Sequence, residues 1–134
     1  MNFAVNYLAV IVAAIAAVVI NALWYSVILK AQVTALRAAD PTIAGRDPAP
    51  PMYGIAIVGQ LLLSLVIAVV IKSTGVTGIG GGLLAGFVLW LGMSLPPIAQ
   101  ILIFGYRNRQ FVVIDGAVWL INACVIGAIH GFWP

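Results

Sequence analysis

Four long apolar runs constrain this chain more than any other feature of its 134 residues. A helix needs roughly 20 apolar residues to cross about 30 Å of hydrocarbon at 1.5 Å per residue. Only 7% of the residues are charged, whereas a soluble domain carries about 25%, so the chain lacks the means to cover a surface that faces water. We therefore predict an all-α integral membrane protein in the lipid bilayer, with one domain over residues 1–134 and spans over residues 7–29, 52–71, 82–104 and 111–133.

The connections between the runs complete the predicted architecture. The longest covers residues 30–51, where stretch 31–39 is predicted as a short interfacial helix that two Asp-Pro pairs then end. The second is rich in glycine, and the third is a polar turn over residues 106–109. Pro96-Pro97 interrupts the third run and removes two backbone donors. We expect an antiparallel bundle of four transmembrane helices, the third kinked at these prolines.

The basic residues predict the orientation of the chain. Four spans put the first and third connections on one side, and these hold Lys30, Arg37, Arg46, Arg107 and Arg109, whereas the other side has Lys72. By the positive-inside rule, residues 30–51 are cytoplasmic and both termini lie outside, as in a multi-pass protein of a bacterial inner membrane. Basic residues spread singly through loops do not form a phosphate-tracking stripe, so no nucleic-acid partner is expected.

Groups that carry catalysis are scarce in the sequence. The chain has one cysteine, Cys124, and one histidine, His130, too few for the usual protein-only zinc or haem site. His130 lies far along the last run from any candidate acid, so no set of nucleophile, base and orienting group is expected. We predict no enzyme, with no catalytic residue, no cofactor and no metal.

Several polar side chains interrupt the apolar runs, and polar groups inside a bilayer are candidate functional residues. Asn21 lies eight residues before the cytoplasmic end of the first run, a depth of about 12 Å. Counting residues from the ends of the other predicted spans puts their polar side chains in the cytoplasmic or central part of the membrane as well. The predicted polar cluster is Asn21, Gln60, Ser64, Gln100, Asp115 and Asn122.

Asp115, Asn122 and His130 recur on one face of the last predicted helix. One interpretation is a polar track that lines a cavity. In the other, Asn122 bonds to a neighbouring helix, Asp115 pairs with Arg107 or Arg109, and His130 lies at the outer surface, because polar side chains often hold membrane helices together.

Two faces of small residues are predicted to pack helices closely. Both repeat every four residues, and such faces let two backbones approach each other. They join either the third and fourth helices or two copies of the chain. The residues are Gly78, Gly82 and Gly86 in the third run and Ala123, Gly127 and Gly131 in the fourth.

Three pieces of sequence carry a family resemblance: Asn6-Tyr7, the stretch 21–26 that reads NALWYS, and residues 114–116 that read IDG. With them, nearly the whole chain resembles the domain of unknown function 1761 family, an uncharacterised bacterial group of small four-helix membrane proteins. The resemblance implies the four-helix topology and no established activity.

Two functional hypotheses follow. The first is a structural or accessory subunit of a homo-oligomer or a larger membrane complex, motivated by the lack of catalytic groups and by the two small-residue faces. The alternative is a transporter or channel for a small solute that uses the polar cluster in the cytoplasmic half of the bundle.

Overall fold

The computed structural model describes residues 1–40, 50–105 and 108–134, and the regular structure in these ranges is helical. Four helices are long and apolar enough to cross a membrane, which confirms the predicted class of all-α membrane protein. They are Tyr7–Ile28, Pro50–Thr74, Gly78–Phe104 and Arg109–Phe132. Residues 41–49, with the predicted Asp-Pro bonds at 40–41 and 47–48, and residues 106 and 107 of the predicted turn at 106–109 lie outside the described residues.

The first span consists of two helical segments. Helix α1 (Tyr7–Leu23) starts at Asn6, whose side chain accepts a hydrogen bond from the Ala9 backbone N–H at 3.1 Å and so satisfies one open donor of the first turn. The span then widens into a π-helical turn, η1 (Trp24–Ile28). Helix α2 (Lys30–Ala39) follows, so the short helix expected over residues 31–39 is present.

The third span changes its helical geometry just before the two prolines. It consists of α4 (Gly78–Leu89), the π-helical turn η2 (Trp90–Ser94) and α5 (Leu95–Phe104). Pro96 lacks an N–H, and its ring crowds the carbonyl four residues back. The Leu95 N–H accordingly donates to the carbonyl of Trp90, five residues back, and the prolines fall in the first turn of α5, where the missing donors are tolerated.

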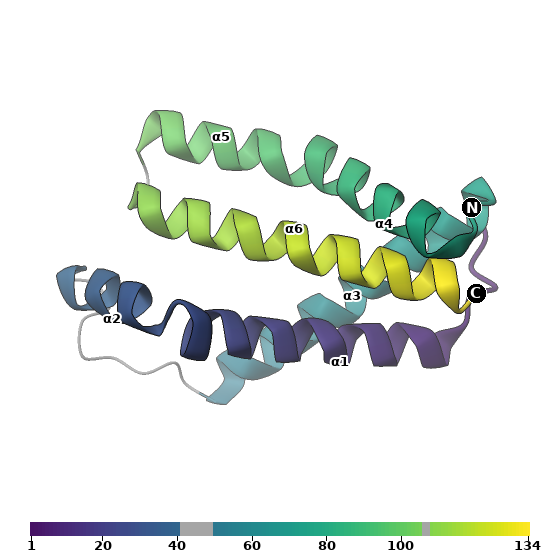
Figure 1. The fold of residues 1–134 in the computed structure, drawn as a ribbon, viewed down its shortest axis with the longest axis horizontal. Coiled ribbons are helices and arrows are strands. Elements are labelled where there is room, and N and C mark those ends of the chain that lie inside the picture. The colour runs from purple at the N-terminus through teal and green to yellow at the C-terminus, as the bar shows by residue number, and fades with distance from the viewer. Residues whose placement is uncertain (41–49, 106–107) are drawn as a thin grey trace.

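Helix α6 (Arg109–Phe132) is the centre of the fold. It contacts α1, α4 and α5 as well as α3 (Pro50–Thr74), and Figure 1 shows it between α4–α5 and α1. Both chain ends lie at one end of the long helices and α2 lies at the other (Figure 1). The Asn2 backbone N–H donates to Ser73 Oγ at 2.8 Å, which ties the first residues to the end of α3.

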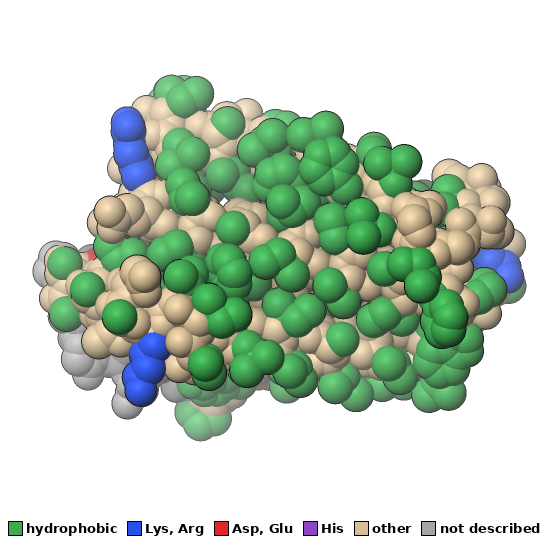
Figure 2. All heavy atoms as spheres, in the orientation of Figure 1, with side chains coloured by type: hydrophobic (Ala, Val, Ile, Leu, Met, Phe, Trp, Pro, Cys, Tyr) green, Lys and Arg blue, Asp and Glu red, His purple; other side chains and the backbone are tan. Residues whose placement is uncertain are grey.

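Small side chains let α1, α3 and α6 pack closely. The buried cluster at their interface combines alanines with isoleucines, which fill the space between backbones held near one another. Its members are Ala13, Ala17, Ile67, Ile71, Ala123 and Ile126. Outside this cluster most large apolar side chains are exposed. Figure 2 shows apolar side chains over the long middle of the visible face and Lys or Arg side chains at its ends, the distribution that a bilayer requires.

The two small-residue faces pack against each other within the chain. A Cβ placed on Gly82 would overlap the backbone carbonyl of Gly127, and one on Gly86 would overlap that of Ala123. A Cβ on Gly131 would likewise overlap the carbonyl of Gly78. Of the two arrangements predicted from the sequence, the structure therefore contains the one that joins the third and fourth spans.

Candidate functional site

Polar side chains connect α1, α3 and α6 at three levels, beginning at the α2 end. The hydroxyl of Tyr25 donates a short hydrogen bond to the carboxylate of Asp115. Beside it, the indole N–H of Trp24 donates to the backbone carbonyl of Ile114 at 3.2 Å. Both donors lie in η1, so this π-helical turn contacts the beginning of α6.

The middle level is a pair of amides. Asn122 Nδ2 donates to Asn21 Oδ1 at 2.9 Å, and the Asn122 side chain is fully buried, at 0% exposed. Asn122 Oδ1 has no hydrogen-bond partner among the described residues. An unpaired buried carbonyl costs about 1–3 kcal/mol, so this oxygen is a position where a water or a polar ligand group is favourable.

The third level lies toward the chain termini. Ser64 Oγ is 2.9 Å from the carbonyl oxygen of Val10, to which it donates, and 3.0 Å from His130 Nε2. A hydroxyl has one proton to donate, so the proton in the bond to His130 comes from Nε2. Ser64 and His130 are both buried, at 0% and 4% exposed.

A groove of about 450 Å³ opens toward the α2 end between α1, η1, α2 and α3. Residues 50–59 of α3, some of which form one side of the groove, are all exposed, so this part of the helix does not pack tightly against α1. The polar residues that line the groove are Asn21, Tyr25, Ser26, Arg37, Tyr53 and Gln60. Gln60 Oε1 is buried there and has no hydrogen-bond partner among the described residues.

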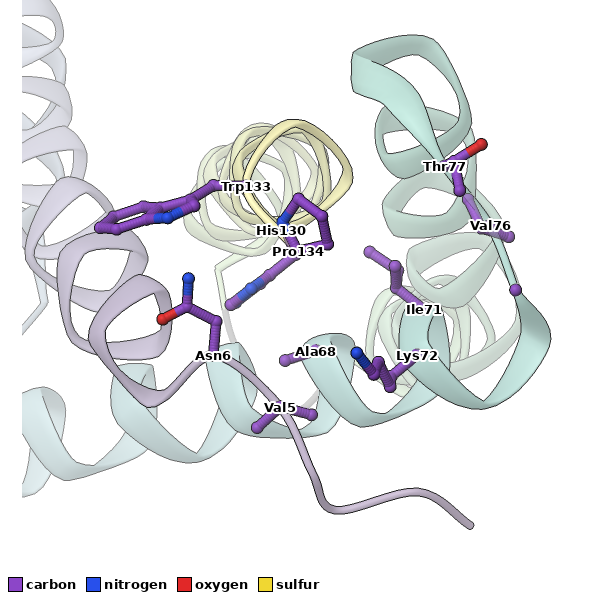
Figure 3. A pocket seen from close by; sticks show the side chains of 11 residues that line it. Val5, Asn6, Ala68, Ile71, Lys72, Val76, Thr77, His130, Trp133 and Pro134 are labelled. Carbon is purple, nitrogen blue, oxygen red and sulfur yellow. The ribbon is translucent and has the colours of Figure 1, made fainter.

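A smaller pocket of about 170 Å³ lies at the terminal end of the same three helices. Its lining comes from the residues before α1, the end of α3 and the end of α6. Figure 3 shows Asn6, Lys72 and His130 around this space, with Trp133 beside it. Among the described residues, no three His, Cys, Asp or Glu side chains gather closely enough to hold a metal ion.

The structure brings part of the predicted polar cluster together. Asn21 and Gln60 line the groove, and Asn122 and Asp115 connect to it through their bonds to Asn21 and Tyr25. Gln100 is exposed on α5. The cluster is therefore centred on α1, α3 and α6, without α5.

Two placements differ from the expectations. Ser64 was expected to share the depth of Asn21, but it lies beside His130, because it falls beyond the midpoint of α3, toward the end near the chain termini. His130 was expected at the outer surface in one interpretation, but its side chain is buried. The same interpretation has Asn122 bonded to a neighbouring helix, and the structure shows this bond.

Sequence reasoning did not pair Tyr25 with Asp115, although a signal for the pair exists. Tyr25 lies four residues before the end of the first predicted run, and Asp115 lies four residues after the start of the fourth. Equal distances from the same membrane face put both at one depth. Tyr53 and the contribution of Arg37 to the groove have no comparable signal, because they depend on the angle between α1 and α3.

The comparisons with known proteins identify a family. Residues 8–131 match a family model described as "Protein of unknown function (DUF1761)". No curated protein and no solved structure matches the chain.

Proposed function

Because the chain belongs to the DUF1761 family, whose function is unknown, we propose from its geometry that it is a transporter or channel for a small solute. The supporting observation is a pair of pockets with polar side chains in their linings. The groove lies at the α2 end between α1, η1, α2 and α3, and the smaller pocket lies at the terminal end between the residues before α1, the end of α3 and the end of α6. In this proposal the groove with Asn21 and Gln60 is the cytoplasmic vestibule, and the pocket with His130 is the outer one. The chain is an antiparallel bundle in a bacterial inner membrane, with both termini outside and no catalytic role.

An apolar layer separates the two pockets. Ile126 is fully buried between Asn122 and His130, four residues from each along α6. Ala13, Ala17 and Ile67 pack with it. Such a layer excludes water and ions, so in this proposal a solute passes only when α1, α3 and α6 move relative to one another.

The polar pairs beside the pockets give this motion a physical basis. Asn122 bonds to Asn21 on the groove side, and His130 bonds to Ser64 on the other. A hydrogen bond between membrane helices contributes about 0.6 kcal/mol on average and about 1.7 at most. A polar solute offers replacement bonds of similar strength, so the pairs exchange partners at low cost. The π-helical turn η1, which contributes Tyr25 and Ser26 to the groove lining, fits this role, because π-turns occur frequently at functional sites.

The test is flux in proteoliposomes, loaded in turn with small polar solutes of either charge and with inorganic ions. We expect flux above that of empty vesicles for one solute class, and a loss of at least about tenfold in Asn122→Leu, which removes the amide that bonds to Asn21 in the groove lining. Asn108→Leu is the matched control, because Asn108 caps α6 outside the apolar layer. Equal flux in wild type, Asn122→Leu and Asp115→Asn would contradict the proposal.

The accessory-subunit hypothesis remains a second candidate, supported by the exposed first part of α3, part of which also lines the groove. Residues 50–59 of α3 are exposed along their whole length, and Ile55 is 73% exposed. A partner helix would cover this surface. The small-residue faces no longer support a homo-oligomer, because they are occupied within the chain.

Mild-detergent purification from the native membrane, followed by mass spectrometry, tests this candidate. A stoichiometric partner that is lost in Ile55→Ser would support an accessory subunit. Gly59→Ser changes the same exposed segment at a position where an added Cβ meets nothing, so it serves as the control. A chain that purifies alone and still carries solute would exclude the accessory role.

A further inference from the structure

The groove that serves as the proposed cytoplasmic vestibule lies beside a second, apolar pocket. This pocket has about 250 Å³ and no polar lining. It shares Val18 and Ile57 with the groove, so the two pockets are neighbours along α1 and α3, and we call them together the α1–α3 groove. The apolar part is lined by Ile11, Ala14, Ile15, Val19 and Leu61.

The α1–α3 groove is polar at one end and aliphatic at the other. From Ser26 at the polar end to Ile11 at the apolar end it follows 15 residues of the first span, about 22 Å. One leaflet of a bilayer has about 15 Å of hydrocarbon. The groove is therefore longer than one leaflet, so an extended acyl chain that lies in it reaches past the middle of the bilayer.

The chemistry of the polar end indicates an acidic headgroup. Among the described residues that line it, the charged one is Arg37. Asn21, Tyr25, Ser26 and Gln60 add donors and acceptors, and Gln60 Oε1 is buried without a partner among the described residues. Cationic pockets between transmembrane helices are typical binding sites of acidic lipid headgroups.

We propose that the α1–α3 groove binds an acidic membrane lipid, with its headgroup at Arg37 and Gln60 and an acyl chain along Ile57 and Ile15. This inference goes beyond the proposed function, because it assigns a lipid to the groove and does not name the transported solute. An acidic headgroup is preferred to a zwitterionic one because Arg37 brings a positive charge to the polar end. The aliphatic end favours a lipid over a soluble anion, which would leave that end unfilled.

Native mass spectrometry of the chain released from nanodiscs tests the proposal. The nanodiscs contain phosphatidylcholine with a minor share of phosphatidylglycerol. We expect phosphatidylglycerol to stay bound at one per chain, enriched over its share in the disc. Arg37→Gln should reduce this enrichment about fivefold, the effect of one cation near an acidic headgroup. Lys30→Gln removes the same charge from the same helix at a position outside the groove and should leave the enrichment unchanged.

A bulky side chain tests the apolar end. Ile57 is 47% exposed and lines both parts of the groove, so Ile57→Trp fills the groove without entering the core and should abolish the bound lipid. Val58, its exposed neighbour, lines neither pocket, so Val58→Trp should retain it. Equal retention of phosphatidylcholine and phosphatidylglycerol by the wild type, or equal loss in both tryptophan variants, would overturn the proposal.

Two further measurements distinguish lipid binding from binding of a soluble anion and from solute transport. Soluble glycerol phosphate should not displace the bound lipid; displacement at millimolar concentration would assign the polar end to a free anion and overturn the lipid assignment. Solute flux through the Ile57→Trp variant is measured in parallel. If Ile57→Trp loses the lipid but keeps its flux, the groove is a lipid site and is not the transport vestibule. If the wild type binds the lipid but shows no flux for any solute, the transport proposal is wrong and the lipid proposal stands.

Discussion

Trp24 and Trp90 hold the same helix at carbonyls only two residues apart. Their indole N–H groups donate to the backbone oxygens of Ile114 and Gly116, at 3.2 and 3.1 Å. Each tryptophan is the first residue of a π-helical turn, η1 in the first span and η2 in the third. The beginning of α6 is thus bound from two other spans through its backbone.

Replacing the two prolines should release one of these bonds. In Pro96→Ala/Pro97→Ala the backbone regains two donors, so η2 relaxes to a regular α-helix and the Trp90 side chain turns away from Gly116. We expect the Trp90 indole proton to exchange with solvent deuterium faster, while that of Trp24 stays protected, as measured by NMR on the four assigned indole signals. A protected Trp90 indole in this variant would show that the π-turn does not depend on the prolines.

The α4–α6 contact should not tolerate a side chain. Gly86→Val places atoms inside the backbone of Ala123, so we expect a loss of about 3 kcal/mol, the upper end of overpacking costs. Reversible unfolding in mixed micelles measures it. Gly80→Ala, in the same helix but with nothing within 4 Å of the added Cβ, should change stability by less than about 1 kcal/mol. Similar losses in both variants would mean that α4 packs by another face.

The Ser64–His130 contact should contribute to stability. Ser64→Ala removes the buried hydroxyl and leaves a donor on His130 without its partner, at a cost of about 1–2 kcal/mol in the free energy of unfolding. Ser73→Ala alters an exposed serine on the same helix and should cost less than about 0.5 kcal/mol. An unchanged midpoint for Ser64→Ala would indicate that a water molecule takes over the bond.

Tyr25 and Asp115 should be coupled in a double-mutant cycle. Tyr25→Phe removes the donor and Asp115→Asn removes the charged acceptor, so the double variant should lose less than the sum of the singles, by about 1 kcal/mol. Tyr7→Phe combined with Asp115→Asn is the control, because the Tyr7 hydroxyl bonds to Phe3 near the chain start. Additive losses for Tyr25 and Asp115 would rule out a direct contribution of this bond.

Single cysteines test the orientation. With Cys124 replaced by alanine, we expect Lys30→Cys and Arg109→Cys to react with an impermeant maleimide only in inside-out vesicles. Lys72→Cys should react only in intact spheroplasts, because it lies at the opposite end of the helices. The reverse labelling pattern would place the termini in the cytoplasm and exchange the two proposed vestibules.

The sequence predicts the spans well because their physical cause is local. Residues 52–71 are apolar whatever surrounds them, and the structure extends this run to Pro50–Thr74. The small-residue faces are predictable for the same reason, since a glycine repeat marks a close approach wherever it packs. The sequence left open whether the partner was α6 or a second copy, because both arrangements bury the same atoms.

The site is less predictable because it depends on how helices cross. The depth of Asn21 and Asn122 follows from counting residues, and they do meet. Ser64 was misplaced because it lies one turn beyond Gln60, which is enough to put it past the middle of α3 and at the level of His130. The α1–α3 groove follows from the loose packing of α3 over residues 50–59, which no composition or spacing encodes.

The glycine contact between α4 and α6 also makes this pair of helices more rigid than the beginning of α3. Backbone packed on backbone at Gly82 and Gly127 has no side-chain rotamers through which the contact could adjust. Any rotation of one helix would drive main-chain atoms into each other, so the contact has one geometry. The exposed beginning of α3 has no such constraint. In the proposed transport cycle we therefore expect α4 and α6 to stay together as one rigid pair and the beginning of α3 to move against them.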